Sequence, residues 1–141
     1  MNYWLMKSEP SAYAWAQMVQ DKKSDWTGVR NHQACHNMKA MKIGDEIFFY
    51  HSNEGREIVG IVKVSKLYRP DPTDESGKFG MVEVTAVRAL KKPVTLADIK
   101  AHPRLKNMAI LRQSRLSVSP VTPEEWKVIC GLAAPINFMK K

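Results

Sequence analysis

Cysteine is scarce in this sequence, and its hydrophobic residues form no long runs. The two cysteines, Cys35 and Cys130, lack the spacing of a disulfide framework, which favours a reducing compartment. No stretch of 18 apolar residues occurs, so we expect no membrane span. The start, MNYWLMKSEP, lacks the basic and long apolar regions of a signal peptide and predicts a strand instead. We therefore expect an intracellular protein, in the cytoplasm or, in a eukaryote, in the nucleus.

Motifs of common enzymes and metal sites are absent as well. There is no G-x-S-x-G, no HExxH and no glycine loop for phosphates. Cys35 and His36 are adjacent, and neighbours on a helix point about 100° apart, so they do not pair easily as nucleophile and base. His32, Cys35 and His36 would share one helix side, with His51 as a fourth ligand, but no CxxC pair supports a zinc site. We therefore expect no catalytic residues, no metal and no cofactor.

Acidic residues are outnumbered by basic ones. The 141 residues contain 22 Lys and Arg against 14 Asp and Glu, a formal charge of +8. Such an excess favours polyanionic partners, although a well-solvated basic surface explains it equally well. The basic residues are spread along the chain, so any basic patch must be assembled by folding. The length and the absence of repeats, linkers and low-complexity segments indicate one domain, 1–141.

The hydrophobic pattern predicts a mixed α+β domain, a small curled sheet or barrel with helices at its edges. We expect strands over 2–6, 46–52, 58–68 and 80–90, a loop over 69–78, and an extended segment around Leu116 and Val118.

Four helical segments are expected between these strands. The first begins at Ser8 and buries Ala12, Trp15, Ala16 and Val19, and the second spans 31–41. Thr95 and Asp98 form a capping box for a turn over 96–102. Thr122, Pro123 and Glu125 start the last helix, which buries Trp126, Ile129 and Cys130 and ends at Gly131.

The stretch SDWTGVRNHQ (24–33) places an indole in a polar segment without hydrophobic periodicity. Reading a single base requires an aromatic face, donors and acceptors for the base edge, and cations for the backbone. Trp26, Asn31 and Arg30 supply one of each, and Gly28 permits the bend that would bring them together. A core position for Trp26 under a loop is the equal alternative.

Three further segments carry suitable side chains. KSEP (7–10) lies where a strand enters a helix, FFYHS (48–52) ends a strand, and RQSRLSV (112–118) alternates basic and apolar residues. Ordinary capping, a satisfied loop carbonyl and a charged edge strand are the respective structural alternatives. The polar candidates in these segments are Lys7, Ser8, Glu9, Tyr50, His51, Ser52, Arg112, Arg115 and Ser117.

In this order, the four segments resemble the EVE domain family. The resemblance runs from Tyr3 to about Ile129. It rests on YWLMKSEP (3–10), the W-TGVRN-QA match that begins at 26, KIGDEIFFYHS (42–52), IVGIVKV (58–64), YRPDPT (68–73), PVTL-DIK (93–100) and LRQSRLSVSPVTPEEW (111–126).

The resemblance implies a PUA-like fold, a curled mixed β-barrel flanked by short helices and related to YTH and ASCH domains. It implies binding of nucleic acid, DNA or RNA, through a modified base, notably a modified cytosine, in a central pocket, with no known catalytic activity. By residue match the base-binding pocket contains Lys7, Ser8, Glu9, Trp26, Val29, Arg30, Asn31, Tyr50, His51, Ser52, Arg112, Leu116 and Ser117.

The sequence departs from the family pattern at two places. Cys35-His36 replaces a frequent Arg-Asn, which would weaken backbone contacts if that Arg binds phosphate, and Met81 replaces a common Trp.

We therefore hypothesise a protein that binds one modified base, either flipped out of a duplex or unpaired. The base stacks on Trp26, while Ser8, Asn31 and Ser117 form hydrogen bonds with its edge. Lys7, Arg30 and Arg112 hold the flanking phosphates.

Two alternatives belong to other classes. One is an ASCH-like hydrolase acting on nucleic acid or a nucleoside, with Lys7, Glu9 and His51 as acid–base groups. The other is a sensor that binds a free small molecule in the same pocket.

Overall fold

The computed structural model describes residues 1–134, and its centre is a six-stranded mixed sheet. The strand order is β2-β5-β4-β3-β1-β6. β1 is parallel to β3, and the other neighbouring pairs are antiparallel. The strands are β1 (Tyr3–Ser8), β2 (Lys23–Asp25), β3 (Glu46–His51), β4 (Glu57–Pro70), β5 (Gly80–Thr95) and β6 (Val118–Val121).

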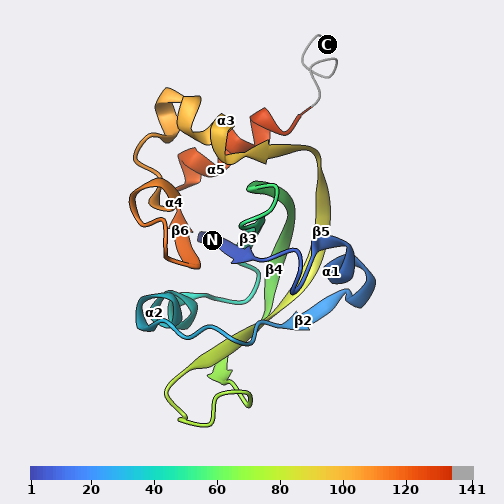
Figure 1. Ribbon diagram of the computed structural model, residues 1–141, viewed down its shortest axis with the longest axis vertical. Helices are drawn as coiled ribbons and strands as arrows, with labels where there is room; N and C mark the ends of the chain where they lie inside the picture. Colours follow the sequence, from blue (N-terminus) through green and yellow to red (C-terminus); the bar gives the residue numbers. More distant parts are fainter. Residues whose placement is uncertain (135–141) are drawn as a thin grey trace.

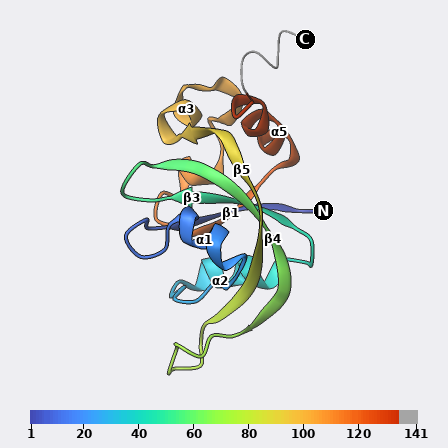
Figure 2. The same ribbon diagram turned by 90° about the vertical axis from the view of Figure 1, so that its right-hand side faces the viewer.

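The sheet curls strongly, as expected for a PUA-like α+β fold. Figures 1 and 2 show β4 and β5 as long curved ribbons that extend over most of the height of the molecule. Their pairing shifts register at four places, and β3 shifts against β4 between Phe49 and Tyr50. Each shift bends the strand and increases its twist. The shifts also interrupt the alternating pattern, which is why β4 and β5 extend beyond their predicted ends.

Short helices and one 3₁₀ turn flank the sheet. They are α1 (Trp15–Asp21), α2 (His32–Ala40), α3 (Leu96–Ala101), η1 (Pro103–Leu105), α4 (Ala109–Arg112) and α5 (Pro123–Leu132). In Figure 1, α2 lies on the opposite side of the sheet from α3 and α5. No helix within residues 1–134 is both long and apolar enough to span a bilayer.

The prediction for the first helix was wrong in its start and in its buried face. The helix begins at Trp15, because the N–H groups of Ala12 and Tyr13 both donate to the Glu9 carbonyl and hold the preceding residues in a turn. Met18 is the buried residue of α1, and Val19 is 49% exposed.

The C-terminal predictions had mixed outcomes. Both capping boxes are confirmed, since Thr95 pairs reciprocally with Asp98 and Thr122 with Glu125. The extended segment begins only at Val118, because residues 109–112 form α4. Gly131 does not end the last helix, which runs on to Leu132.

The two faces of the sheet carry two separate hydrophobic clusters. Trp4, Met6 and Phe49 belong to the cluster on the α2 side. Leu5 and Phe48 belong to the cluster on the α5 side, as strand alternation requires. Trp126 stacks on Phe48, with ring centroids 3.8 Å apart, in the second cluster. The turn after β1 and the loop after β2 come together at one edge of the first cluster, which positions the candidate site.

Candidate nucleic-acid interface

The turn after β1 forms one wall of the candidate site. The Ser8 hydroxyl donates to the Tyr13 carbonyl at 2.6 Å, which closes the turn over residues 8–13. Ser8 therefore does not cap α1, whose N-cap is Ala14. Because its proton is engaged, the Ser8 oxygen offers an acceptor to a ligand. The Glu9 side chain is exposed at the rim of this wall.

Trp26 belongs both to the core and to the site. Its backbone N–H donates to the Val82 carbonyl at 2.8 Å, which continues the pairing of β2 with β5. The indole meets Phe49 edge-on, with ring centroids 5.5 Å apart at 88°, and Tyr13 at 6.3 Å and 89°. Only 8% of Trp26 is exposed. The ring is therefore held rigidly by other aromatic groups.

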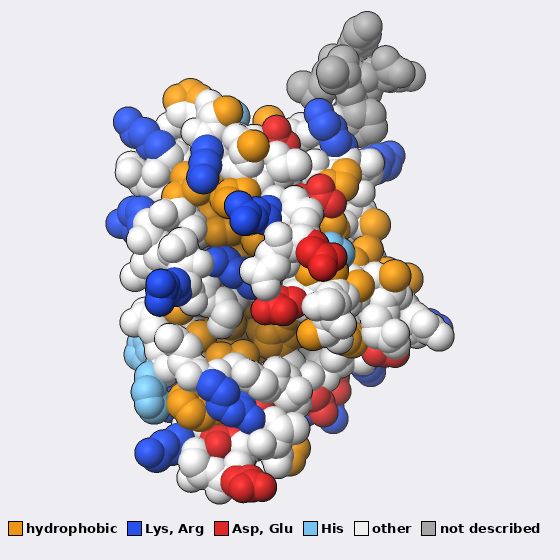
Figure 3. All heavy atoms as spheres, viewed as in Figure 1, with side chains coloured by type: hydrophobic (Ala, Val, Ile, Leu, Met, Phe, Trp, Pro, Cys, Tyr) orange, Lys and Arg blue, Asp and Glu red, His pale blue; other side chains and the backbone are white. Residues whose placement is uncertain are grey.

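A hollow of about 490 Å³ lies beside this indole, and we call it the Trp26 cavity. Its volume falls within the range of ligand pockets, about 300–1,000 Å³. Figure 3 shows this face of the molecule hollowed near its centre over a hydrophobic floor. The lining residues are Lys7, Ser8, Glu9, Ala12, Tyr13, Ser24, Asp25, Trp26 and Thr27.

A buried carboxylate anchors the backbone that follows Trp26. Asp71 accepts hydrogen bonds from the Gly28 N–H at 2.8 Å and from the Arg30 guanidinium at 3.0 Å. Its other oxygen accepts from the N–H of Thr73 at 2.8 Å and from the hydroxyl of Thr73 at 2.7 Å. Gly28 adopts a φ of 85°, which favours glycine at the predicted bend. Burial alone would raise the pKa of the Asp71 carboxyl, but these bonds outweigh it and hold the pKa well below its ordinary value.

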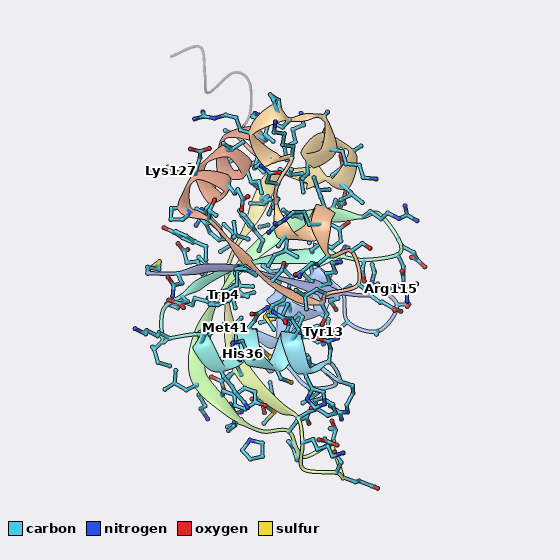
Figure 4. All side chains as sticks on the ribbon, turned by 90° about the vertical axis from the view of Figure 1, so that its left-hand side faces the viewer. Trp4, Tyr13, His36, Met41, Arg115 and Lys127 are labelled. Carbon is cyan, nitrogen blue, oxygen red and sulfur yellow. The ribbon has the colours of Figure 1, made fainter. Side chains whose placement is uncertain are left out.

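Asn31 lies on a second hollow, the Asn31 cavity, of about 400 Å³. Its side-chain oxygen accepts from the Ala34 N–H at 2.9 Å and caps α2, so the amide nitrogen is the group left for a ligand. Leu116 lines this cavity while packing in the core, and exposed Arg115 lies beside it. In Figure 4, Arg115 and Tyr13 lie toward the same side of the molecule, away from Trp4.

Tyr50 and Ser52 lie on a third hollow of about 210 Å³, which we call the Arg56 cavity after its exposed arginine. Lys7 lines both this cavity and the Trp26 cavity. Its ammonium donates to the Ser114 carbonyl at 2.7 Å, and burial lowers the pKa of the Lys7 ammonium. Because Ser114 also lines the Asn31 cavity, this bond lies where the three cavities adjoin.

Five of the sequence-derived candidates line none of these three cavities within the described chain: Val29, Arg30, His51, Arg112 and Ser117. Val29 is buried in the core, and the Ser117 carbonyl accepts the Lys7 N–H at 2.9 Å. The Nε2 atom of His51 accepts the Trp15 N–H at 3.0 Å, and burial lowers the pKa of its imidazole. Arg112 is exposed at the end of α4.

Sequence reasoning missed several lining residues. Tyr13 was assigned to a helix, although the AYAW segment follows a proline and could have indicated an aromatic turn. Asp25 precedes Trp26 directly and forms an ion pair with Arg69, a long-range contact that local sequence does not reveal. Arg56 lies in a polar hairpin loop at a φ of 48°, and the sequence offered no signal for it.

The His and Cys residues considered for zinc have other neighbours. The ring of His32 lies 4.9 Å from that of Phe79, and buried Cys35 lies 4.0 Å from the Val29 carbonyl. Across residues 1–134, no three His, Cys, Asp or Glu side chains gather closely enough to hold a metal ion.

Comparison with known proteins finds relatives and solved structures that are similar over nearly the whole of this chain. A family model described as the EVE domain matches residues 2–132. Human thymocyte nuclear protein 1 is 34% identical over 165 aligned residues, which cover 93% of this chain and 73% of the relative. The crystal structure of human THYN1 in complex with DNA containing 5-methylcytosine matches with a TM-score of 0.90 at 32% identity, covering 96% of this chain and 99% of that one.

Two further solved structures mark the breadth of the similarity. Protein Rpa0253 from Rhodopseudomonas palustris matches with a TM-score of 0.89 at 55% identity, covering 94% of this chain and 93% of that one. An ASCH protein from Zymomonas mobilis matches with a TM-score of 0.57 at 11% identity, covering 93% and 95%, and this likeness shows the fold alone.

Proposed function

Since the chain belongs to the EVE domain family, we propose that it binds nucleic acid through one modified base, which enters the Trp26 cavity. The relative crystallised with DNA that contains 5-methylcytosine is similar over nearly the whole of both chains, so that base is the first candidate. The single observation that carries the proposal is the rigid indole at the edge of a cavity whose other wall is polar.

The chemistry of the cavity suits a cytosine derivative. Aromatic stacking contributes about 1–3 kcal/mol per base, and here Phe49 and Tyr13 hold the indole in place. Glu9 and Asp25 are carboxylates at the cavity wall, and the exocyclic amine of cytosine donates to such acceptors. A base without that amine would lose this contact with Glu9, whereas Asp25 already pairs with Arg69.

A base inside a duplex must leave its stack to reach this cavity. Extrusion costs a few kcal/mol, and the cost is smaller for a mismatched or unpaired base. We therefore expect single strands and weakened pairs to bind more tightly than matched duplexes. The excess of basic residues supports a strong salt dependence of the affinity.

The test measures affinity for matched oligonucleotides that differ only in one base, cytosine or 5-methylcytosine, at fixed ionic strength. The wild-type protein should favour the modified strand and leave it intact. Glu9→Gln should weaken binding of both strands by a similar factor, because both bases carry the exocyclic amine. It should leave thermal stability unchanged, because Glu9 is exposed at the cavity rim. Glu75→Gln is the matched control, since Glu75 is exposed and outside the cavity. Equal affinity for both strands would contradict the proposal.

Trp26 needs a graded pair of variants because it is also a core residue. Trp26→Ala should lose most of the binding, but removing a buried aromatic costs about 3–5 kcal/mol of stability. Trp26→Phe keeps an aromatic face and should retain much of the affinity. Unchanged affinity in both variants, with folding verified by circular dichroism, would remove stacking from the account.

The same assay addresses the two alternatives. Product formation that disappears in Glu9→Gln would support a hydrolase, and binding of a free nucleoside but no strand would support a sensor. His51, one of the three acid–base groups of the hydrolase alternative, is engaged with the Trp15 N–H and lies outside the Trp26 cavity, which gives that alternative little support.

A further inference from the structure

The Arg56 cavity is separate from the cavity that we assign to the base, and its polar groups are mostly donors. Lys7, Tyr50, Ser52, Asn53, Arg56 and Ser114 line it, together with Leu96 and Ile110. Tyr50 is 3% exposed, so its ring is fixed in the core below the cavity. An ammonium, a guanidinium and hydroxyl groups facing one small hollow are the donor set that binds phosphate oxygens.

The two cations of this cavity form no ion pair within the described part of the chain. Within residues 1–134, ion pairs are formed by Arg30, Lys66, Arg69 and Arg104, and by neither Lys7 nor Arg56. The Arg56 carbonyl accepts the Leu96 N–H at 2.8 Å, which fixes the loop from which the guanidinium extends.

Tyr50 adds a donor to the same site. Burial raises the pKa of the Tyr50 hydroxyl, and the nearby charge of Arg56 offsets only part of this rise. The hydroxyl therefore keeps its proton near neutral pH and can donate to an anion.

The position of Lys7 relates this cavity to the base. Lys7 lines both the Arg56 cavity and the Trp26 cavity, so one side chain separates the two hollows. A nucleotide whose base occupied the Trp26 cavity would have its sugar–phosphate close to this ridge.

We propose that the Arg56 cavity binds the phosphodiester adjacent to the base in the Trp26 cavity, through Arg56, Lys7 and the hydroxyls of Tyr50 and Ser52. This inference rests on the proposed function and adds the contact that holds the strand while the base is bound. It also moves the phosphate site away from Arg30, whose guanidinium is already paired with Asp71.

The test compares the salt dependence of affinity in the wild type, Arg56→Gln and Arg56→Lys. For duplex DNA each phosphate contact contributes about 0.9 to the slope of log affinity against log salt. Between about 50 and about 200 mM salt the wild type should therefore lose up to about 3.5-fold more affinity than Arg56→Gln, in which Lys7 remains beside the same phosphate. Arg56→Lys, which keeps the charge, should retain most of the wild-type slope. Lys127→Gln is the matched control, because Lys127 is exposed on α5 and lies on the opposite side of the molecule from Arg115 (Figure 4).

A second arm localises the contact. Replacing the phosphate beside the modified base by an uncharged methylphosphonate should weaken binding of the wild type more than binding of Arg56→Gln, in which Lys7 remains beside that phosphate. An unchanged salt slope in Arg56→Gln, or a full methylphosphonate effect in that variant, would overturn the inference. Titration with inorganic phosphate tests whether the cavity binds free phosphate instead of the strand. Binding of inorganic phosphate, together with an unchanged salt slope for the oligonucleotide in Arg56→Gln, would also overturn the inference.

Failure of the inference and failure of the proposed function give different results. Arg56→Gln should weaken binding of the cytosine and 5-methylcytosine strands by the same factor, because it touches only the backbone. A lower slope without any preference for the modified strand would retain the phosphate site and reject base recognition. A preserved preference for the modified strand, with an unchanged salt slope in Arg56→Gln, would retain base recognition and reject the phosphate site.

Discussion

Asp71 is the residue by which the stability of the candidate site can be tested most directly. Its carboxylate is completely buried at the side chain and accepts four hydrogen bonds, two at each oxygen. Asp71→Asn keeps the shape of the side chain but replaces one of its two acceptor oxygens by an NH₂ group. In either orientation of the amide, that NH₂ group faces two hydrogen-bond donors. Two charge-assisted bonds are lost, and Arg30 loses its counter-charge.

The magnitude follows from those two bonds. Hydrogen bonds to charged groups contribute about 1.5–3 kcal/mol each, so the lower limit predicts a loss of about 3 kcal/mol in the free energy of unfolding. At about 3 °C per kcal/mol for a chain of this size, the Tm should fall by about 10 °C. Glu75→Gln, an exposed change of the same charge four residues away, should stay within about 0.5 kcal/mol of the wild type.

The pH dependence provides an independent check on Asp71. Because its pKa in the folded state is depressed, its contribution is present above the unfolded pKa of about 3.9 and is lost as the pH falls below that value toward the folded pKa. Calorimetric unfolding of the wild type and Asp71→Asn should therefore give curves that converge below about pH 4. A Tm for Asp71→Asn within about 2 °C of the wild type at neutral pH would refute the reasoning, because it would put the cost well under 1 kcal/mol.

Three further predictions concern stability, each measured by thermal or denaturant unfolding. Gly60→Ala should destabilise by about 1–3 kcal/mol, because its Cβ would lie 2.4 Å from the Trp15 ring, and a wild-type Tm would contradict the tight contact. Gly131→Ala should stabilise by about 0.5–1 kcal/mol, since the position is helical and the added methyl meets open space; a loss would contradict this. Burial depresses the pKa of His51, so its contribution to the free energy of unfolding should decline as the pH falls below about 6.5. His51→Gln should flatten that decline, and an equally steep decline in the variant would contradict this.

Local signals in the sequence predicted much of the secondary structure. The capping boxes at Thr95 and Thr122 are short-range hydrogen-bond patterns, and both are present as expected. The curled α+β fold followed from the strand pattern together with the family resemblance. The start of α1 could not be predicted, because the competitor to a Ser8 cap is the Tyr13 carbonyl, which accepts the Ser8 hydroxyl in a turn.

The candidate site was predictable in composition more than in arrangement. Lys7, Ser8, Glu9 and Trp26 line one cavity, and all four were among the sequence-derived candidates at the ends of β1 and β2. The division of the remaining candidates among three cavities depends on which face of the sheet each side chain takes. Tyr50 illustrates this, because it packs in the cluster on the α5 side and so reaches the Arg56 cavity rather than the indole.

The dual placement of Trp26 has a consequence for how binding and stability are coupled. The side chain that would stack on a base is also fixed edge-on by Phe49 and Tyr13, so its orientation exists before any ligand arrives. A preorganised aromatic face avoids the ordering cost of about 0.5–1.5 kcal/mol that a mobile side chain would pay on binding. Changes at Trp26 therefore alter folding and affinity together, whereas Glu9 and Arg56 are exposed at cavity rims and can be altered with little effect on the core. If Glu9→Gln weakens base binding at an unchanged salt slope and Arg56→Gln lowers the salt slope, base binding and backbone binding are divided across the ridge formed by Lys7.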